Sequence, residues 1–176
     1  MINIAPVRKK LMVKASQSRA FAVFTADMSR WWPASHSILK SPLKECIIEP
    51  RVGGRWYSVG EDGSSCQTGY VMAWTPPQAL VLAWQINPQW QYDPGLVTEV
   101  EVRFIAEGAE TTRIELEHRC LERMGERAAE ARDAVDSSNG WDKILESFRL
   151  FAETRPRGIR DASPGSVYLR ELRRGR

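Results

Sequence analysis

Two histidines and three cysteines are the side chains of this sequence best suited to proton transfer, nucleophilic attack or metal binding: His36, His118, Cys46, Cys66 and Cys120. Structural zinc sites combine closely spaced cysteines and histidines, whereas these residues are dispersed and form no Cys-x-x-Cys pair. An odd number of dispersed cysteines also suits a reducing compartment better than a disulfide framework. We therefore expect no metal site and no bound cofactor, and we interpret each cysteine as a small, buried, apolar residue.

His118 is the single candidate for a catalytic group. It lies in register with the alternating apolar residues of "TTRIELEHR", so we expect its side chain to point inward near the end of a strand. A histidine there could orient a ligand or transfer a proton near neutral pH. The alternative is a partly buried histidine bonded to a neighbouring backbone group or to the region of Arg19 or Arg123. His36, in the loop "PASHSI", ranks below His118 as a candidate.

The glycine-rich stretch of residues 49–71, "EPRVGGRWYSVGEDGSSCQTGYV", allows two interpretations. A phosphate-binding loop would need a helix directly after the glycines and a Lys-Ser/Thr pair at the right spacing. Here aromatic and β-branched residues typical of strands follow the glycines, and the lysine is absent. The Asp-Gly pair between the two strand-like runs is a strong hairpin signal. The sequence therefore predicts a β-hairpin, with Gly53 and Gly54 in the turn before it.

The composition is that of an ordinary globular domain. The chain has 176 residues, of which 43% are hydrophobic and 27% charged, and this suits one domain with its own core. No run approaches the roughly 20 apolar residues that cross a bilayer, and the N-terminus lacks the apolar segment of a signal peptide. We therefore expect a cytoplasmic protein with no membrane partner.

The net charge of +3 is unevenly distributed. Residues 154–176 hold seven arginines against Asp161 and Glu171, a local balance of 7 − 2 = +5, so the rest of the chain carries 3 − 5 = −2. A basic tail could contact nucleic acid or an acidic partner, but we interpret it as a solvated terminal segment and expect no nucleic-acid partner. We expect a single domain over residues 1–153, followed by a basic tail containing proline and glycine over residues 154–176.

The hydrophobic periodicity predicts an α+β fold. A strand over residues 7–15 precedes a helix capped by Ser16 and a short helical piece, and about six strand-like runs follow within residues 43–119. "LERMGERAAEARDAVD" is helix-prone, and we expect Ser137 or Ser138 to cap a last helix, "NGWDKILESFRLFAET". The apolar stripe of that helix has to pack on a large surface. The order of elements indicates an antiparallel sheet wrapped around one helix, with charged residues forming ion pairs on its solvated face.

Several motifs that occur in one order resemble a known superfamily. The opening "FAVFT…WW", the centre "EPRVGGRWY…DGS…G.V..W.PP..LVL.W", the strands "TEVEVRF" and "RIELEHR" and the terminal "GWDKILESF" are similar to the START-like (SRPBCC) superfamily. Within it they look closest to the branch related to the activator of the heat-shock-protein-90 ATPase. The resemblance covers residues 7–153. It implies a helix-grip fold: a curved antiparallel β-sheet wrapped around a long C-terminal α-helix, with two short helices after the first strand and a cavity between sheet and helix.

Members of this superfamily bind or transform apolar small molecules, so the resemblance implies a ligand-binding site in that cavity. Ligand pockets are mostly apolar and carry a few placed polar groups. We expect the ligand-binding residues on the terminal helix, at inward strand positions, in the aromatic strand region around Trp56 and Tyr70, and on the short helices at the mouth. They are Trp31, Trp32, Trp56, Tyr70, Trp84, His118, Trp141, Leu145 and Phe148. For each aromatic residue, plain core packing is the alternative.

Three functions compete for this sequence. The first is non-catalytic binding of an apolar or aromatic small molecule, which is favoured by seven tryptophans and by the absence of serine-hydrolase, metalloprotease and dinucleotide-binding motifs. The second is an enzyme of the cyclase, dehydratase or hydrolase sort that uses His118 as acid and base. The third is a protein-interaction module with a chaperone or other protein partner, and a homodimer is a further alternative that no residue pattern demonstrates. We adopt the first.

Overall fold

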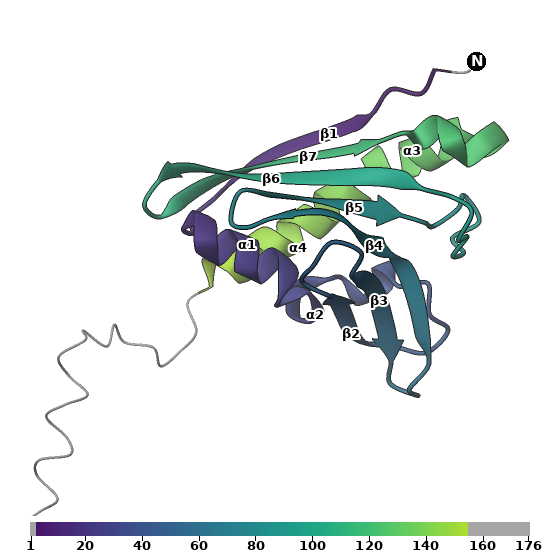
Figure 1. Ribbon diagram of the computed structural model, residues 1–176, viewed down its shortest axis with the longest axis horizontal. Helices are drawn as coiled ribbons and strands as arrows, with labels where there is room; N and C mark the ends of the chain where they lie inside the picture. The colour runs from purple at the N-terminus through teal and green to yellow at the C-terminus, as the bar shows by residue number, and fades with distance from the viewer. Residues whose placement is uncertain (1–2, 155–176) are drawn as a thin grey trace, which may run out of the picture.

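The computed structural model describes residues 3–154, and the seven strands in this part of the chain form one antiparallel sheet in the order β1-β7-β6-β5-β4-β3-β2. The elements are β1 (Val7–Val13), α1 (Gln17–Thr25), α2 (Met28–Trp31), η1 (Ala34–His36), β2 (Leu43–Ile48), β3 (Arg55–Gly60), β4 (Ser65–Thr75), β5 (Ala79–Trp84), β6 (Thr98–Gly108), β7 (Thr111–Arg119), η2 (Leu121–Arg127), α3 (Ala128–Asp136) and α4 (Trp141–Glu153). In Figure 1 the strands β1, β7, β6 and β5 run over α4, while β2 and β3 turn away on the side of α2. The predicted α+β fold is confirmed. Of the predicted tail over residues 154–176, all but Thr154 lies outside the described residues.

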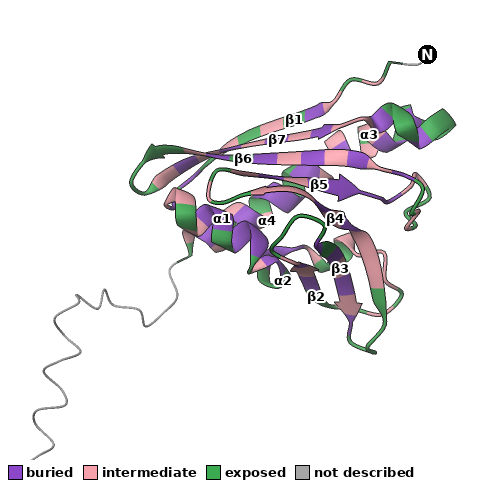
Figure 2. Cartoon of the chain, in the orientation of Figure 1, coloured by how far each residue is buried: buried purple, intermediate pink, exposed green. Residues whose placement is uncertain are grey.

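The C-terminal helix α4 lies at the centre of the fold. Its buried residues recur every three or four positions and therefore form one apolar face. Phe148 on this face packs against Phe24 of α1 and against Trp31 of α2, with ring centroids 5.3 Å apart in both pairs. Figure 2 shows buried positions along α1, α4 and the strands that cover them. Within residues 3–154 no helix has the length and apolarity needed to span a bilayer.

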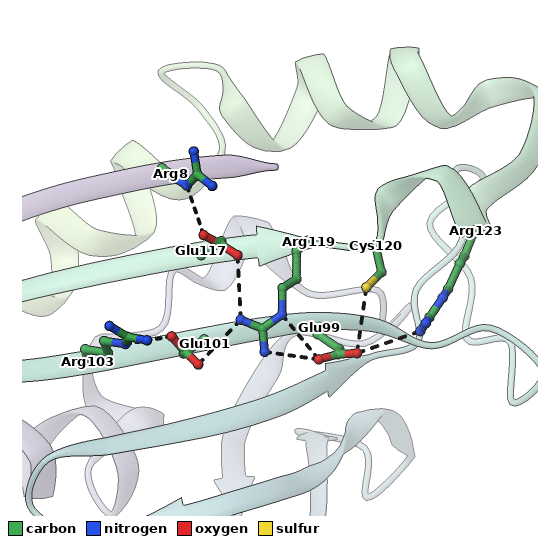
Figure 3. A network of polar contacts seen from close by, with 8 residues as sticks. All are labelled: Arg8, Glu99, Glu101, Arg103, Glu117, Arg119, Cys120 and Arg123. Carbon is green, nitrogen blue, oxygen red and sulfur yellow. Dashed lines mark hydrogen bonds and ion pairs between the residues drawn. The ribbon is translucent and has the colours of Figure 1, made fainter. Parts of the chain in front are cut away.

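The outer face of the sheet carries charges that pair across strands, as predicted (Figure 3). The guanidinium of Arg119 on β7 lies 3.1 Å from Glu99 and 3.4 Å from Glu101, both on β6, and Arg8 on β1 lies 2.9 Å from Glu117 on β7. The hydrogen bond from Arg8 lowers the pKa of the Glu117 carboxyl. Exposed pairs of this kind contribute about 0–1 kcal/mol each. We therefore interpret this network as a solvated sheet surface and place no site there.

A β-bulge bends β4 and shapes the inner face of the sheet. The register between β3 and β4 shifts between Trp56 and Tyr57, which leaves Thr68 of β4 without a partner on β3. A bulge of this kind bends the strand and can re-aim a side chain. At the next residue, Gly69, an added Cβ would lie 1.7 Å from the carbonyl oxygen of Ala83. Glycine is therefore required where β4 and β5 approach each other at the bend.

The helical region after β7 differs from the prediction in two ways. Gly125 has φ 77° and ψ −142°, so the helix-prone segment is interrupted at this residue within η2, and α3 begins only at Ala128. Neither Ser137 nor Ser138 caps the last helix, so that prediction is wrong: the N-cap is Gly140, which has no capping side chain, and the Ser137 hydroxyl donates to a carbonyl at the end of α3 instead. An added Cβ at Gly140 would lie 2.3 Å from the carbonyl oxygen of Val135. The tight turn between α3 and α4 thus excludes any side chain at the cap position.

Candidate functional site: a tryptophan-lined cavity

A cavity of about 650 Å³ lies between the start of α4 and the inner side of β3, β4 and β5. The loop that contains η1, the turn between α3 and α4 and the loop after β5 surround its mouth. The bulged Thr68 contributes to its wall. The predicted position of a site, between the sheet and the C-terminal helix, therefore coincides with a real hollow in the molecule.

Four tryptophans form a closed ring in the wall of this cavity. Trp32 packs on Trp56 with ring centroids 5.9 Å apart, Trp56 packs on Trp84 at 5.8 Å, and Trp84 packs on Trp141 at 5.6 Å. Trp141 closes the ring by packing on Trp32 at 6.4 Å. All four contacts are tilted or edge-to-face, which are the favoured arrangements of aromatic pairs. We call this group the tryptophan ring.

Separate elements position the members of the tryptophan ring. Trp56 and Trp84 occupy inward positions of β3 and β5, Trp32 directly follows α2, and Trp141 is the first residue of α4. Trp32 and Trp84 are 9% and 7% exposed, whereas Trp56 and Trp141 are each 1% exposed. Trp32 and Trp84 therefore offer most of the ring's accessible surface, and the other two support them from behind.

The mouth of the cavity is polar. The exposed or partly exposed polar side chains of the lining include Ser35, His36, Ser37, Ser137, Asn139 and Lys143, and the exposed Trp90 accompanies them. His36 Nε2 lies 2.5 Å from the carbonyl oxygen of Asn139, and Nδ1 lies 2.9 Å from the hydroxyl of Ser35. A carbonyl accepts only, so Nε2 carries the proton and a neutral His36 accepts the Ser35 hydroxyl at Nδ1. His36 thereby joins the loop of η1 to the turn before α4 across the mouth.

His118 points inward as predicted, but it does not border the cavity. Trp141 Nε1 donates to His118 Nδ1 over 3.1 Å, and His118 Nε2 lies 2.8 Å from the hydroxyl of Thr98. The Thr98 hydroxyl in turn donates to the backbone carbonyl of Trp84 over 3.1 Å. These partners differ from the expected Arg19 and Arg123, which donate to other backbone carbonyls. Burial lowers the pKa of His118 to about 3.

Cys46 lies in the cavity wall beside Ser58, whose hydroxyl is 4.0 Å from the thiol. Burial raises the pKa of this thiol to about 11, against smaller opposing contributions from Trp56 and Ser58. The thiolate is the nucleophilic form of cysteine, so Cys46 is a packing residue at neutral pH. Across residues 3–154 no cluster of three His, Cys, Asp or Glu side chains could hold a metal ion.

The structure brings together four of the nine predicted ligand-binding residues. They are the members of the tryptophan ring: Trp32, Trp56, Trp84 and Trp141. A role for them in ligand binding stays a prediction, since the cavity establishes where they lie and not what they bind.

The other five predicted residues lie outside the cavity wall. Trp31, Leu145 and Phe148 are buried in the core between α4, α1 and α2, and the indole of Trp31 donates to the backbone of α1 rather than facing the mouth. Tyr70 is partly exposed on β4, and His118 is fully buried next to Trp84 and Trp141. Periodicity identifies the face of an element on which a residue lies, but it does not give the depth of that residue in the fold.

Sequence reasoning missed Trp90, Thr68 and Lys143, which border the cavity from a loop, a bulge and the start of α4. It also ranked His36 below His118, although His36 is the histidine that borders the cavity. One signal for Trp90 was present: a tryptophan within the polar loop "NPQWQYDPG" has no periodic pattern that would assign it to the core.

Comparisons with known proteins agree with this architecture. A family model described as "Activator of Hsp90 ATPase homolog 1-like protein" matches residues 14–153. A search of curated protein sequences gives no match. Among solved structures, the chain is 37% identical to the anthrahydroquino-gamma-pyrone synthase Txn09 complexed with SUM, with a TM-score of 0.61 and with 84% of this chain and 96% of that chain covered.

Two further solved structures are similar. The chain is 31% identical to CalC, a self-sacrificing resistance protein from Micromonospora echinospora, with a TM-score of 0.63 and with 84% of this chain and 94% of that chain covered. The Aha1 dimer from Colwellia psychrerythraea has a TM-score of 0.56 at 14% identity, with coverage of 85% and 97%, and this is a likeness of fold. The curved sheet around α4 and the match over residues 14–153 lead to one conclusion: the chain belongs to the Activator of Hsp90 ATPase homolog 1-like family, within the START-like superfamily.

Proposed function

We propose that the protein binds a planar aromatic small molecule in the cavity, against the tryptophan ring. The observation that carries this proposal is the presence of four mutually packed indoles in the wall of a cavity of about 650 Å³. Small-molecule sites typically have volumes of about 300–1,000 Å³ and mostly apolar walls. The cavity therefore has the size of such a site, and the tryptophan ring gives part of its wall an apolar lining.

The ring favours flat, aromatic ligands for an electrostatic reason. Aromatic pairs gain about 0.5–1.5 kcal/mol beyond the burial of their apolar area when they adopt tilted, edge-on or offset arrangements. Trp32 and Trp84 keep some accessible surface toward the cavity, and their packing on Trp56 and Trp141 fixes their orientation. A rigid aromatic wall costs little conformational entropy when a ligand binds.

The polar mouth points to oxygen substituents on the ligand. Hydroxyl, amide, imidazole and ammonium groups gather there, while the wall behind them is largely apolar. A molecule with fused rings at the inner end and hydroxyl or carbonyl groups at the mouth would match both halves of the cavity. The relative Txn09 supports this choice, since its name specifies an oxygenated fused-ring compound. Fold alone would not support it, because one fold carries many functions.

Anthraquinone-2-sulfonate is a suitable first probe, because it is planar, tricyclic, oxygenated and water-soluble. We expect saturable quenching of tryptophan fluorescence and a 1:1 complex in native mass spectrometry. The double variant W32F/W84F should bind about tenfold more weakly. Trp74→Phe is the matched control, because Trp74 packs against Phe21 at 5.2 Å and does not border the cavity.

Two results would contradict the proposal. One is the absence of saturable binding to the wild-type protein. The other is an equal loss of affinity in W74F and in W32F/W84F, since this would place the probe outside the cavity. Circular dichroism of each variant establishes that it is folded before its affinity is compared.

Acid–base catalysis on the bound molecule is the second candidate function. The position of His36 in the cavity wall and its hydrogen bond to Ser35 favour it, as does the description of Txn09 as a synthase. The earlier candidate, His118, is fully buried and does not border the cavity. Anthrone tests this function, because a base beside it accelerates deuterium exchange at its acidic C10 position. NMR should then show faster exchange with the wild-type protein than with H36Q, and equal rates would exclude His36.

The remaining predicted partners stay predictions. A second copy of the chain and a chaperone are suggested by the Aha1 dimer and by the description of the family model, but the likeness to that dimer lies at 14% identity. The cytoplasmic location likewise stays a prediction. Light scattering of the purified protein at several concentrations would test the homodimer directly.

A further inference from the structure

Trp90 is a half-exposed tryptophan at the edge of the cavity. Its side chain is 51% exposed, yet it contributes to the cavity wall from the loop between β5 and β6. The four members of the tryptophan ring, by comparison, are at most 9% exposed. Removing apolar surface from water is favourable, so the exposed indole of Trp90 would be stabilised by contact with an apolar molecule in the adjoining cavity.

The loop that carries Trp90 is held by its own hydrogen bonds. Asn87 is at the centre of this arrangement: its side-chain oxygen accepts from the backbone N–H groups of Gln89 and Gln91, each over 3.0 Å. Its backbone N–H donates to the carbonyl of Gln91, and its carbonyl accepts from the N–H of Trp90, each over 2.9 Å. A bridge between Ile86 and Tyr92 closes the base of the loop. The loop therefore presents Trp90 at a fixed position.

The backbone of Trp90 is in a conformation that tryptophan disfavours. Its φ is 60°, in the left-handed region where glycine and asparagine are tolerated and bulky side chains are strained. The hydrogen bonds around Asn87 impose this conformation, and they would do so equally well with asparagine or glycine at position 90. Local stability therefore does not explain the tryptophan, and its strained backbone indicates a functional role for the side chain.

We propose that Trp90 covers the outer side of a planar aromatic ligand that sits against the tryptophan ring, and that it sets how slowly the ligand leaves. This rests on the proposed function and deepens it by assigning the residue that closes the site. A ligand with an aromatic face exposed at the mouth would be held longer through contact with Trp90, whereas a small or purely aliphatic ligand would not. Because related complexes differ mostly in dissociation rate, the effect should appear mainly in that rate.

The test compares W90N and W90F with the wild-type protein. The protein is loaded with anthraquinone-2-sulfonate and mixed rapidly with excess γ-cyclodextrin, which traps the released probe, and the recovery of tryptophan fluorescence gives the dissociation rate. We expect about tenfold faster release from W90N and about threefold from W90F, with association rates within about twofold of the wild type. Val52→Asn is the control, because Val52 is also exposed, at 66%, but does not border the cavity.

Thermal stability separates a functional role from a structural one. Asparagine suits the left-handed backbone, so W90N should melt at or above the temperature of the wild type while it releases the probe faster. Release from W90N at the wild-type rate overturns the inference and leaves the proposed function standing. Faster release together with a lowered melting temperature also overturns it, since the loop itself would then be damaged. Failure of the wild-type protein to bind the probe overturns both.

Discussion

The indole N–H of Trp141 donates to Nδ1 of His118 over 3.1 Å, so a fully buried histidine fixes the orientation of one member of the tryptophan ring. An indole nitrogen is a donor only, which means that Nδ1 carries no proton and that Nε2 does. His118 Nε2 then donates to Thr98, whose own hydroxyl proton goes to the carbonyl of Trp84. One neutral histidine therefore links two ring members, Trp84 and Trp141, and its role is to position them.

The first prediction concerns the pH dependence of stability. Burial lowers the pKa of His118 to about 3 in the folded protein, whereas an unfolded chain binds a proton on histidine near pH 6.5. Below pH 6.5 the unfolded state therefore takes up a proton that the folded state does not. The free energy of unfolding is therefore undiminished by His118 above pH 6.5, and it falls by about 1.4 kcal/mol per pH unit as the pH drops from 6.5 toward 3.

Urea unfolding of the wild type, H118Q and H36Q between pH 5 and 7 measures this effect. Glutamine offers an acceptor to Trp141 and a donor to Thr98 but does not titrate, so H118Q should lose most of the slope in this range. H36Q should keep the slope, because it leaves His118 unchanged. If H118Q and the wild type have the same slope, the assignment of a neutral, buried His118 is wrong.

The second prediction compares two serines. The Ser16 hydroxyl accepts from the backbone N–H of Arg19 over 3.2 Å and caps α1, as the sequence predicts. Ser16→Ala should therefore lower the free energy of unfolding by about 1 kcal/mol. Ser137→Ala should change it by less than about 0.5 kcal/mol, since Ser137 is exposed and caps no helix N-terminus.

The measurement is the midpoint of denaturant unfolding of each variant. A shifted midpoint reports a change in stability when the slope of the free energy of unfolding against denaturant concentration stays the same. If S137A lowers the free energy of unfolding as much as S16A does, Ser137 stabilises the turn before α4.

The sequence predicted the fold well because the hydrophobic patterns that identify strands and helices are local. Alternation along β6 and β7 identified the inward face, and the stripe of α4 identified the helix that the sheet covers. The failure at Ser137 has its cause in the backbone of the turn: the close approach of Gly140 to the carbonyl of Val135 determines where the helix starts, and neither capping preference nor periodicity reports it.

The candidate site could be predicted only in part for a related reason. Trp84 was identifiable as an inward strand residue and Trp56 as part of an aromatic strand, but their closure into a ring depends on contacts with Trp32 and Trp141, which lie far from them in the sequence. The sequence could not tell which of the two histidines borders the cavity, because an inward side chain can be enclosed by core residues. Burial depth follows from the packing of all the elements together, and His118 and His36 differ in that respect.

The third prediction tests the bend that opens the inner face of the sheet. An added Cβ at Gly69 would lie 1.7 Å from the carbonyl oxygen of Ala83, and a backbone atom cannot move aside as a side chain can. Gly69→Ala should therefore separate β4 from β5 beside the bulge and destabilise the protein by about 3 kcal/mol or more. Gly108→Ala is the matched control: Gly108 also lies in a strand, but nothing is within 4 Å of an added Cβ there.

The same pair of variants tests whether the bend shapes the cavity. Both neighbours of Gly69 border the cavity: Thr68 precedes it on β4, and Trp84 is its partner on β5. Displacement of this strand pair should therefore weaken binding of anthraquinone-2-sulfonate in G69A even under conditions where the variant is folded, while G108A should bind as the wild type does. Equal stability of G69A and G108A in urea would show that an added Cβ at position 69 has more room than its 1.7 Å distance from the Ala83 carbonyl oxygen implies. The bulge would then not shape the cavity in the way described.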